Sequence, residues 1–346
     1  MILGFDILGF IISWASLFGI YAILAISLNI EVGYTGMANF GKVAFYALGA
    51  YLTASLTIFT FLVLHGLSYP LHSIEAIVAL GELAGKNPIL NIGLFILMII
   101  LSFIFAGIVG YLVTYPTLRV GPAFLGITVL SFGELIRVFL RHLEPLGATK
   151  GLAGIPHPLA WIENPTLRDG IFTIIILFFT FIVLLISERI GNSPFGRVLR
   201  AIRDDEVAAL CLGKHVPRIK ATMLFIGSGF AGIAGVLWAY YAGSVNPDMF
   251  IPAVTFNIWA MVIFGGLGNN IGAMVGAAIL TFLDRVSFVI NILFPELPIT
   301  PDYIRWMFIG LLIVLMLMFK PKGIIPEKPI KTPAWTLLSK EGETSG

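Results

Sequence analysis

The stretch ILNIGLFILMIILSFIFAGIVGYLVT, residues 89–114, decides the fold class because it contains no charged side chain. An α-helix needs about 20 apolar residues to cross about 30 Å of hydrocarbon, and this stretch exceeds that length. In the whole chain 58% of the residues are hydrophobic and only 12% are charged, against about 25% charged in an ordinary soluble domain. The sequence therefore predicts an all-α, polytopic bundle of membrane helices.

Window hydrophobicity predicts about nine transmembrane helices. The predicted spans are residues 5–30, 43–65, 89–114, 120–140, 170–188, 218–242, 251–264, 268–290 and 303–320. The seventh is shorter than a full crossing, so it either spans the bilayer or re-enters it. We divide the chain into a transmembrane domain at 1–325 and a C-terminal tail at 326–346.

The distribution of Lys and Arg predicts the orientation. Loop 189–220 carries seven basic residues against three acidic ones, whereas loops 66–88, 141–169 and 291–302 have no basic excess. The positive-inside rule places the basic loop in the cytoplasm. Nine spans then put the N-terminus outside and the C-terminal tail in the cytoplasm.

Two glycine-rich stretches resemble each other. GYTGMANFGKVAFYALGAY at 33–51 and GGLGNNIGAMVGAAIL at 265–280 both open with G-x-x-G and then space further glycines at helical intervals. Such pairs mark an internal repeat with the transport pathway at its interface in many transporters. The alternative is that both are close-packing helices.

No motif in the sequence indicates a cofactor, a metal site or a nucleotide site. GMANFGK at 36–42 fits the front of a phosphate-binding loop, but Val43 replaces the required Ser or Thr. Gly227, Gly229 and Gly232 spell G-x-G-x-x-G inside an apolar helix, where they predict a packing face. The chain has one cysteine, Cys211, and no basic footprint for nucleic acid. We therefore expect a protein that is not an enzyme.

Loop 189–220 carries an amphipathic pattern. Apolar residues recur at i, i+3, i+4 and i+7, namely Phe195, Val198, Leu199 and Ile202. Arg200 and its basic neighbours project from other faces, which is typical of a helix lying along a surface. Asp204 or Asp205 can cap a second short helix, EVAALCLG, which Gly213 would end. The surface that these helices contact is either a partner protein or anionic lipid.

This loop also carries a resemblance to a known family. SPFGRVLRAIRDDEVAALCLGKHVPRIK at 193–220 resembles the ATPase-docking loop of branched-chain amino-acid ABC permeases, with the E-A-A…G signature of importer subunits. LNIEVGYTGMANFGKVAFYALGAY at 28–51, LSFGELIRVFLR at 130–141, GSGFAGIAGVLWAYYAGSVNPDMF at 227–250, AMVIFGGLGNNIGAMVGAAIL at 260–280 and FKPKGII at 319–325 resemble the same family in the same order. The resemblance is closer to the M-type than to the H-type subunit.

The resemblance implies a function and partners. The chain would be a permease subunit of an ATP-driven importer in a prokaryotic plasma membrane, with a second related permease chain, two ATPase subunits and an extracytoplasmic substrate-binding protein. The implied docking residues are Phe195, Leu199, Arg200, Ile202, Asp204, Asp205, Glu206, Ala208, Ala209 and Gly213. Members of the family usually carry His where Lys42 stands, which leaves the substrate open.

Five residues are candidates for the substrate pathway. Glu134 and Arg137 lie one helical turn apart within a span, where ionisable groups are rare; they could equally be a structural ion pair near the outer interface. Tyr34, Thr35 and Asn39 lie in the glycine-broken segment, where freed backbone N–H groups could meet a substrate carboxylate.

Two other functions remain open. A permease for urea or short amides of the same family is one alternative. The other is an ATP-independent secondary transporter or channel, which normally keeps several ionisable residues in its spans. Glu134 is nearly alone in the predicted spans, and this favours a subunit that draws its energy from partners.

Overall fold

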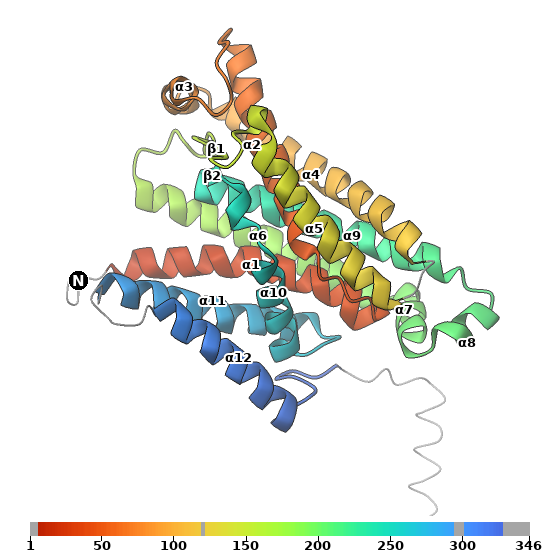
Figure 1. Cartoon of the computed structure of the whole chain (residues 1–346). Coiled ribbons are helices and arrows are strands. Elements are labelled where there is room, and N and C mark those ends of the chain that lie inside the picture. The colour runs from red at the N-terminus through yellow and green to blue at the C-terminus, as the bar shows by residue number, and fades with distance from the viewer. Residues whose placement is uncertain (1–5, 119–121, 294–300, 328–346) are drawn as a thin grey trace, which may run out of the picture.

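The helices of this chain run between two opposite ends of one bundle, as a computed structural model of residues 6–118, 122–293 and 301–327 shows (Figure 1). The α-helices are α1 (Ile7–Thr35), α2 (Lys42–Leu64), α3 (Ile74–Ala84), α4 (Pro88–Thr117), α5 (Pro122–His142), α6 (Pro165–Asn192), α7 (Pro194–Asp204), α8 (Glu206–Cys211), α9 (Val216–Ala242), α10 (Pro252–Gly265), α11 (Asn270–Leu293) and α12 (Pro301–Phe319). The shorter elements are η1 (Glu144–Leu146), β1 (Leu152–Ala153), β2 (Ser244–Val245) and η2 (Pro247–Met249).

Local sequence signals explain where these helices begin. The side chains of Asp6, Ser73 and Asn164 accept hydrogen bonds from backbone N–H groups in the first turns of α1, α3 and α6. Such caps satisfy donors that have no partner within the helix. Proline occupies the first turn of α4, α6, α7, α9 and α10, where its missing N–H costs nothing.

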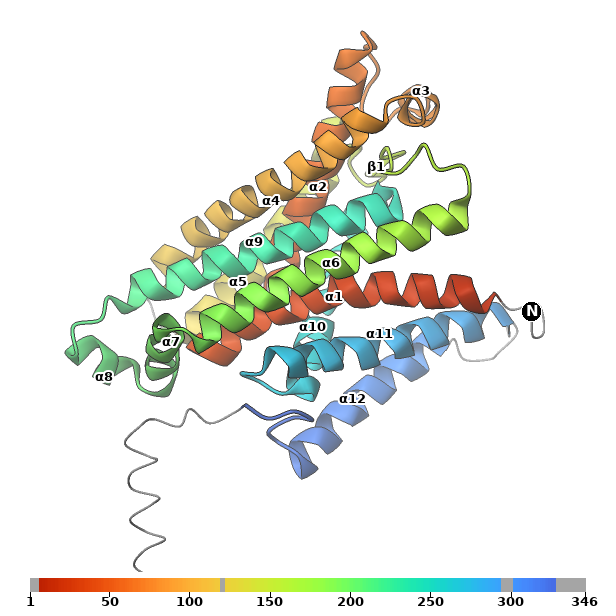
Figure 2. The same ribbon diagram turned by 180° about the vertical axis from the view of Figure 1, so that it is seen from behind.

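Small residues let α9 pack closely against its neighbours. A Cβ on Gly232 would lie 2.7 Å from the Ser102 carbonyl oxygen of α4, and one on Gly235 would lie 2.3 Å from the Tyr46 carbonyl oxygen of α2. Because lipid provides no hydrophobic drive between helices, close backbone approach supplies the packing energy. The G-x-G-x-x-G stretch is therefore a packing face, as predicted. Figure 2 shows α4, α9, α6 and α1 following one another across the bundle.

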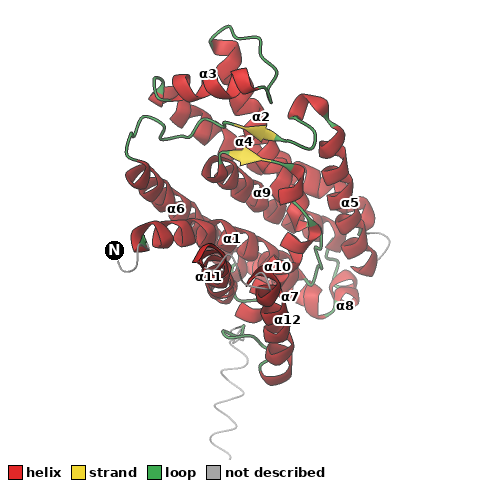
Figure 3. Cartoon of the chain, turned by 60° about the vertical axis from the view of Figure 1, so that its left-hand side comes forward, coloured by secondary structure: helices red, strands yellow, loops and turns green. Residues whose placement is uncertain are grey.

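The connections gather at the two ends. β1 pairs antiparallel with β2, with Leu152 opposite Val245, and Figure 3 shows this two-stranded sheet at the end that also carries α3. Helices α7 and α8 lie at the opposite end (Figure 1). The sequence analysis predicted neither the strand pair nor α3, which forms within the predicted loop 66–88.

The predicted count of about nine membrane spans is not confirmed. Each predicted span contains a helix, but within the described residues seven helices are long and apolar enough to cross a membrane. Helices α5 and α12 are not among the seven. The turn η2 and α10 together form a 19-residue candidate span at Pro247–Gly265, so the short seventh segment gains the length to cross. A multi-pass helical membrane protein is the supported description.

Candidate functional site

The first glycine-rich stretch breaks the chain between α1 and α2. Gly36 ends α1 in the left-handed conformation, with φ of 71°, and its N–H donates to the Val32 carbonyl oxygen at 3.0 Å. Glycine adopts this conformation without the strain of a side chain. Residues 37–41 then lead into α2, which begins at Lys42. The break therefore brings the end of one helix and the start of the next together inside the bundle.

A buried ion pair connects the two helices across this break. Lys42 Nζ lies 2.7 Å from Glu31 Oε1, and both side chains are 0% exposed. The amide of Asn39 donates to Glu31 Oε2 at 2.9 Å. A charge inside a membrane protein is costly unless a partner neutralises it. Because both carboxylate oxygens have a donor, the pair is a satisfied polar core between α1 and α2.

Helix α9 shapes the space around the pair. A Cβ on Gly227 would lie only 2.0 Å from Glu31 Oε1, so only glycine leaves room for the carboxylate there. The packing stripe on α9 thus has a second effect, because it lets a carboxylate approach the helix backbone.

The three pathway candidates of this segment lie in the same buried region. Tyr34, Thr35 and Asn39 are each at most 2% exposed. Two N–H groups of the break already have partners, since Gly41 donates to Asn39 Oδ1 at 3.0 Å and Val43 donates to Thr255 Oγ1 at 3.1 Å. Direct contact of these groups with a substrate carboxylate stays a prediction.

The second glycine-rich stretch contacts the first. A Cβ on Gly33 would lie 2.6 Å from the backbone nitrogen of Gly268. Asn29 joins the two stretches, because its Oδ1 accepts from the Gly268 N–H at 2.9 Å and its Nδ2 donates to Asn270 Oδ1 at 2.8 Å. The two stretches that resemble each other in sequence therefore meet in space.

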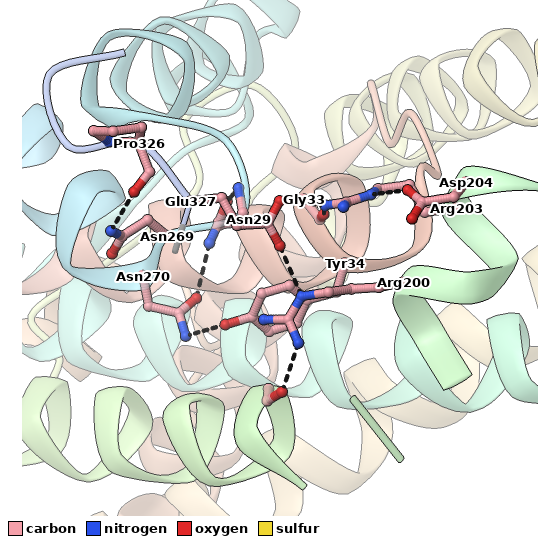
Figure 4. A network of polar contacts seen from close by, with 12 residues as sticks. Asn29, Gly33, Tyr34, Arg200, Arg203, Asp204, Asn269, Asn270, Pro326 and Glu327 are labelled. Atoms are coloured by element: carbon pink, nitrogen blue, oxygen red, sulfur yellow. Dashed lines mark hydrogen bonds and ion pairs between the residues drawn. The ribbon is translucent and has the colours of Figure 1, made fainter. Parts of the chain in front are cut away.

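Asn270 extends this contact to α6. Its Nδ2 donates to the Tyr34 hydroxyl at 2.8 Å and to Glu188 Oε1 at 3.0 Å. Figure 4 shows Asn270 pointing toward the Tyr34 hydroxyl, with Arg200 of α7 lying over the tyrosine ring. The guanidinium carbon of Arg200 is 4.8 Å from the ring centroid, a cation–π distance. Buried polar groups of four helices thus form one continuous network.

Two arginines and Glu327 attach α7 to this end of the bundle. Arg200 Nε donates to Glu327 Oε1 at 2.7 Å, and Arg203 Nη1 donates to Glu327 Oε2 at 2.8 Å. Arg203 also donates to the Gly33 carbonyl oxygen at the end of α1. Glu327 belongs to the predicted tail, of which residues 328–346 lie outside the described part of the chain. The boundary at 325 stays a prediction.

The apolar stripe of α7 faces the bundle. Leu199 and Ile202 are at most 2% exposed. Leu199 belongs to the core of the bundle, against which Phe195 packs from a partly buried position, and Ile202 packs with Ala209 of α8 and Val216 of α9. A partner protein would therefore not meet Leu199 or Ile202. The exposed apolar surface lies on α8 and just after it, where Val207, Leu210 and Leu212 are 69%, 49% and 78% exposed.

The predicted capping of α8 is confirmed. Asp205 accepts a hydrogen bond from the Ala208 N–H at 3.0 Å, and Gly213 has a left-handed φ of 73°. Of the other predicted docking residues, Glu206 pairs with Lys220 Nζ at 2.6 Å. Asp204 and Ala208 are exposed, and Ala209 is buried.

The third group of candidates lies on α5. Arg137 donates to Glu134 Oε2 at 2.8 Å, as the one-turn spacing predicted, and reaches Asp248 of η2 at 3.4 Å. The two side chains are 19% and 36% exposed. Among the described residues their hydrogen bonds join them to each other and to Asp248, and none joins them to Tyr34, Thr35 or Asn39, so the five pathway candidates do not form one hydrogen-bonded cluster.

The argument that Glu134 is nearly the only ionisable residue in the spans is wrong. Helix α1 extends to Thr35 and α2 begins at Lys42, so both members of the buried pair belong to membrane helices. Helix α11 carries Asp284 and Arg285 as well. The predicted boundaries stopped just short of Glu31 and Lys42, because window averages fall where a charge occurs.

Comparison with known proteins identifies what the chain resembles. Residues 10–317 match the model of the family described as "Branched-chain amino acid transport system / permease component". The probable branched-chain amino acid transport permease protein LivM of Methanocaldococcus jannaschii is 34% identical over 95% of this chain and 96% of the relative. No solved structure matches the chain.

Two bacterial relatives allow a comparison of this chain with the M-type and the H-type subunit. The high-affinity branched-chain amino acid transport system permease protein LivM of Escherichia coli is 30% identical over 90% of this chain and 69% of its own length. LivH of Salmonella typhimurium is 26% identical over 88% of this chain and 91% of its own length. The higher identity to the LivM proteins agrees with the predicted M-type.

Proposed function

Because the chain belongs to the permease family of branched-chain amino acid transport systems, we propose that it provides the translocation pathway for these amino acids in an ATP-driven importer. The relatives' names supply the substrate class. Urea and short amides are the alternative substrates, and a comparison of uptake distinguishes them. In proteoliposomes containing the assembled importer, we expect competition by leucine, isoleucine and valine and none by urea.

The energy for transport comes from two ATPase subunits that bind at α8. The observation that carries this proposal is the apolar surface of Val207, Leu210 and Leu212 on a capped helix beyond the end of the bundle. Contiguous exposed apolar side chains outside the hydrocarbon are typical of protein contacts. A second permease chain and an extracytoplasmic binding protein complete the proposed assembly.

Helix α7 transmits the movement of the ATPases to the pathway. It contacts the bundle through buried Leu199 and through the two arginines that bind Glu327, and it contacts α8 through buried Ile202, which packs with Ala209. A displacement of α8 would therefore move the end of α1, where Arg203 contacts the Gly33 carbonyl oxygen. Glu31 lies two residues before Gly33 on α1 and pairs with Lys42 of α2, and in the proposed mechanism this pair closes the pathway.

A charge placed on α8 tests the docking role. We expect Leu210→Asp to abolish co-purification of ATPase subunits in mild detergent and to abolish uptake, because a carboxylate would be desolvated in an apolar contact. Ile74→Asp, on exposed Ile74 of α3 at the opposite end, is the matched control and should retain both. Normal ATPase binding by Leu210→Asp would contradict the docking role and favour lipid contact.

The native cysteine tests the orientation. Cys211 is exposed on α8, so a membrane-impermeant maleimide should label it in inside-out vesicles stripped of ATPase subunits and not in intact cells. Glu75→Cys in a Cys211→Ser background places the only thiol at the opposite end, and its labelling should be reversed. Labelling of both proteins from one side would exclude the proposed topology, with the N-terminus outside and the C-terminus in the cytoplasm.

A further inference from the structure

A second polar site lies in a cavity that the sequence analysis did not single out. The cavity has a volume of about 380 Å³ and is lined by residues of α1, α9, α11 and α12 and of the segment containing α10. Sites for small molecules typically have about 300–1,000 Å³. Figure 1 shows α10 crossing in front of α1, with α11 and α12 beneath it.

The walls of the cavity combine apolar surface with opposite charges. Leu17, Ile251 and Val254 supply aliphatic surface. Asp284 and Arg285 of α11 line the same cavity. Consecutive residues of a helix do not face each other, so this acid and this base present their charges in different directions.

Arg285 keeps one donor available. Its Nη2 donates to the Tyr241 hydroxyl at 2.9 Å, and its guanidinium lies 5.6 Å from the centroid of the Phe288 ring. Its Nε is buried and has no hydrogen-bond partner among the described residues. A guanidinium held in this way suits a carboxylate, which can accept a charge-assisted hydrogen bond from the Nε–H.

Asn257 supplies an acceptor on the facing helix. Its side chain is 7% exposed and lines the cavity, and its Oδ1 has no hydrogen-bond partner among the described residues. A buried polar atom without a partner is costly unless a ligand or water completes it. An ammonium group is a donor that could bind both this oxygen and the carboxylate of Asp284.

We propose that this cavity binds the zwitterionic head and the apolar side chain of an amino acid on its way through the membrane. Arg285 binds the carboxylate, Asp284 and Asn257 bind the ammonium group, and the aliphatic wall receives the side chain. The proposal rests on the proposed function and deepens it, because it names the groups that recognise the substrate.

The cavity lies where a substrate that enters from outside would bind first. Tyr21 of α1 lines it, and a rise of 1.5 Å per residue places Tyr21 about 15 Å from Glu31 along the helix. In the proposed orientation the N-terminal end of α1 is outside. An amino acid entering from outside would therefore meet the cavity before it meets the closed Glu31–Lys42 pair.

Uptake by the full importer in proteoliposomes tests the site. We expect Arg285→Gln to raise the KM for leucine at least tenfold, and Arg285→Lys to recover part of this loss because it keeps the charge. Val254→Trp should abolish uptake by filling the cavity. Arg168→Gln, at a partly exposed arginine of α6, and Ile174→Trp, at an exposed position of the same helix, are the controls and should keep wild-type KM and rate. Each variant must co-purify with its ATPases, which excludes a folding defect as the cause.

Each outcome decides one of the two proposals. If the wild-type importer takes up no branched-chain amino acid, the proposed function fails. If the wild type takes up leucine while Arg285→Gln and Val254→Trp stay within twofold of its KM and rate, the cavity is not a substrate site. If Arg285→Gln lowers the rate without changing KM and loses a co-purifying phospholipid, the cavity binds a lipid headgroup, and this also overturns the proposal.

Discussion

The ion pairs Glu31–Lys42 and Glu134–Arg137 both join a glutamate to a basic side chain, but they differ in burial and in the elements that supply them. Glu31 and Lys42 come from two helices and are 0% exposed, and the Glu31 carboxylate also accepts a hydrogen bond from Asn39. Glu134 and Arg137 come from one turn of α5, are 36% and 19% exposed and lie close to Asp248. A buried pair leaves an uncompensated charge when one partner is removed, whereas solvent screens an exposed pair. The buried pair is therefore expected to contribute more to stability than the exposed pair.

The largest effect is expected for Lys42→Met. The substitution leaves the Glu31 carboxylate buried without its cation, and we expect a loss of about 3–5 kcal/mol in the free energy of unfolding. Glu31→Gln combined with Lys42→Met should restore most of it, because the glutamine keeps an acceptor for Asn39. Equilibrium unfolding in mixed micelles measures both. A double variant no more stable than Lys42→Met would mean that the pair itself is not the source of the loss.

A smaller effect is expected for Gly227→Ala. Its Cβ would overlap Glu31 Oε1, and overpacking of this kind costs about 1–3 kcal/mol. Gly93→Ala is the control, since a Cβ at Gly93 meets nothing within 4 Å; it should leave stability unchanged or raise it slightly. If the two alanine variants are equally stable, the glycine is not what accommodates the carboxylate.

His157, which lies outside the membrane helices, extends the comparison to a side chain that burial keeps uncharged. Burial, with a smaller contribution from Arg168, lowers the pKa of His157 to about 4, and its Nδ1 accepts a hydrogen bond from the Leu159 N–H at 3.1 Å. The folded state therefore holds the ring neutral, while the unfolded state binds a proton near pH 6.5.

The contribution of neutral His157 to the free energy of unfolding is fully present above pH 6.5 and falls as the pH drops toward 4. The expected slope is at most about 1.4 kcal/mol per pH unit. His157→Asn keeps an acceptor near the position of Nδ1 and should remove this part of the pH dependence. Unfolding curves at pH 7.5, 6, 5 and 4 measure the free energy of unfolding of both proteins. The same pH dependence in the wild type and in His157→Asn would contradict the role given to His157.

The smallest effect is expected for Arg137→Gln. Because the pair on α5 is partly exposed, its loss should lower the free energy of unfolding by about 1 kcal/mol or less. Unfolding under the conditions used for Lys42→Met provides the direct comparison. A loss as large as that of Lys42→Met would show that exposure does not separate the two pairs, and the contrast between them would fail.

Helices α7 and α8 were the part of the candidate site most open to sequence analysis. Asp205, Glu206 and Gly213 are neighbours along the chain, and a cap, a first turn and a left-handed end depend only on such neighbours. The direction of the α7 stripe was not predictable in the same way. Periodicity shows that Leu199 and Ile202 share a face, but it does not say whether that face meets the bundle or a partner.

The glycine-broken segment was predicted and its chemistry was only partly predicted. Tyr34, Thr35 and Asn39 were placed in a glycine-broken segment; in the structure Tyr34 and Thr35 are the last residues of α1, and Asn39 lies in the break that follows. The ion pair that closes it was missed, because hydropathy treats Glu31 and Lys42 as the edges of two spans. The pairing appears only when the break at Gly36 sets the first residue of α2 beside the last turns of α1.

The sequence by itself determined the apolar helices, the caps of α8 and the glycine turns, because hydrophobic length and local hydrogen bonds depend on residues close together in the chain. The tertiary structure decided which polar groups meet. Asn29 and Asn270 are 241 residues apart, and Arg200 and Glu327 are 127 residues apart. Such contacts are made only when packing brings distant helices together, and desolvation in the interior then leaves each buried polar group dependent on the partner that packing provides.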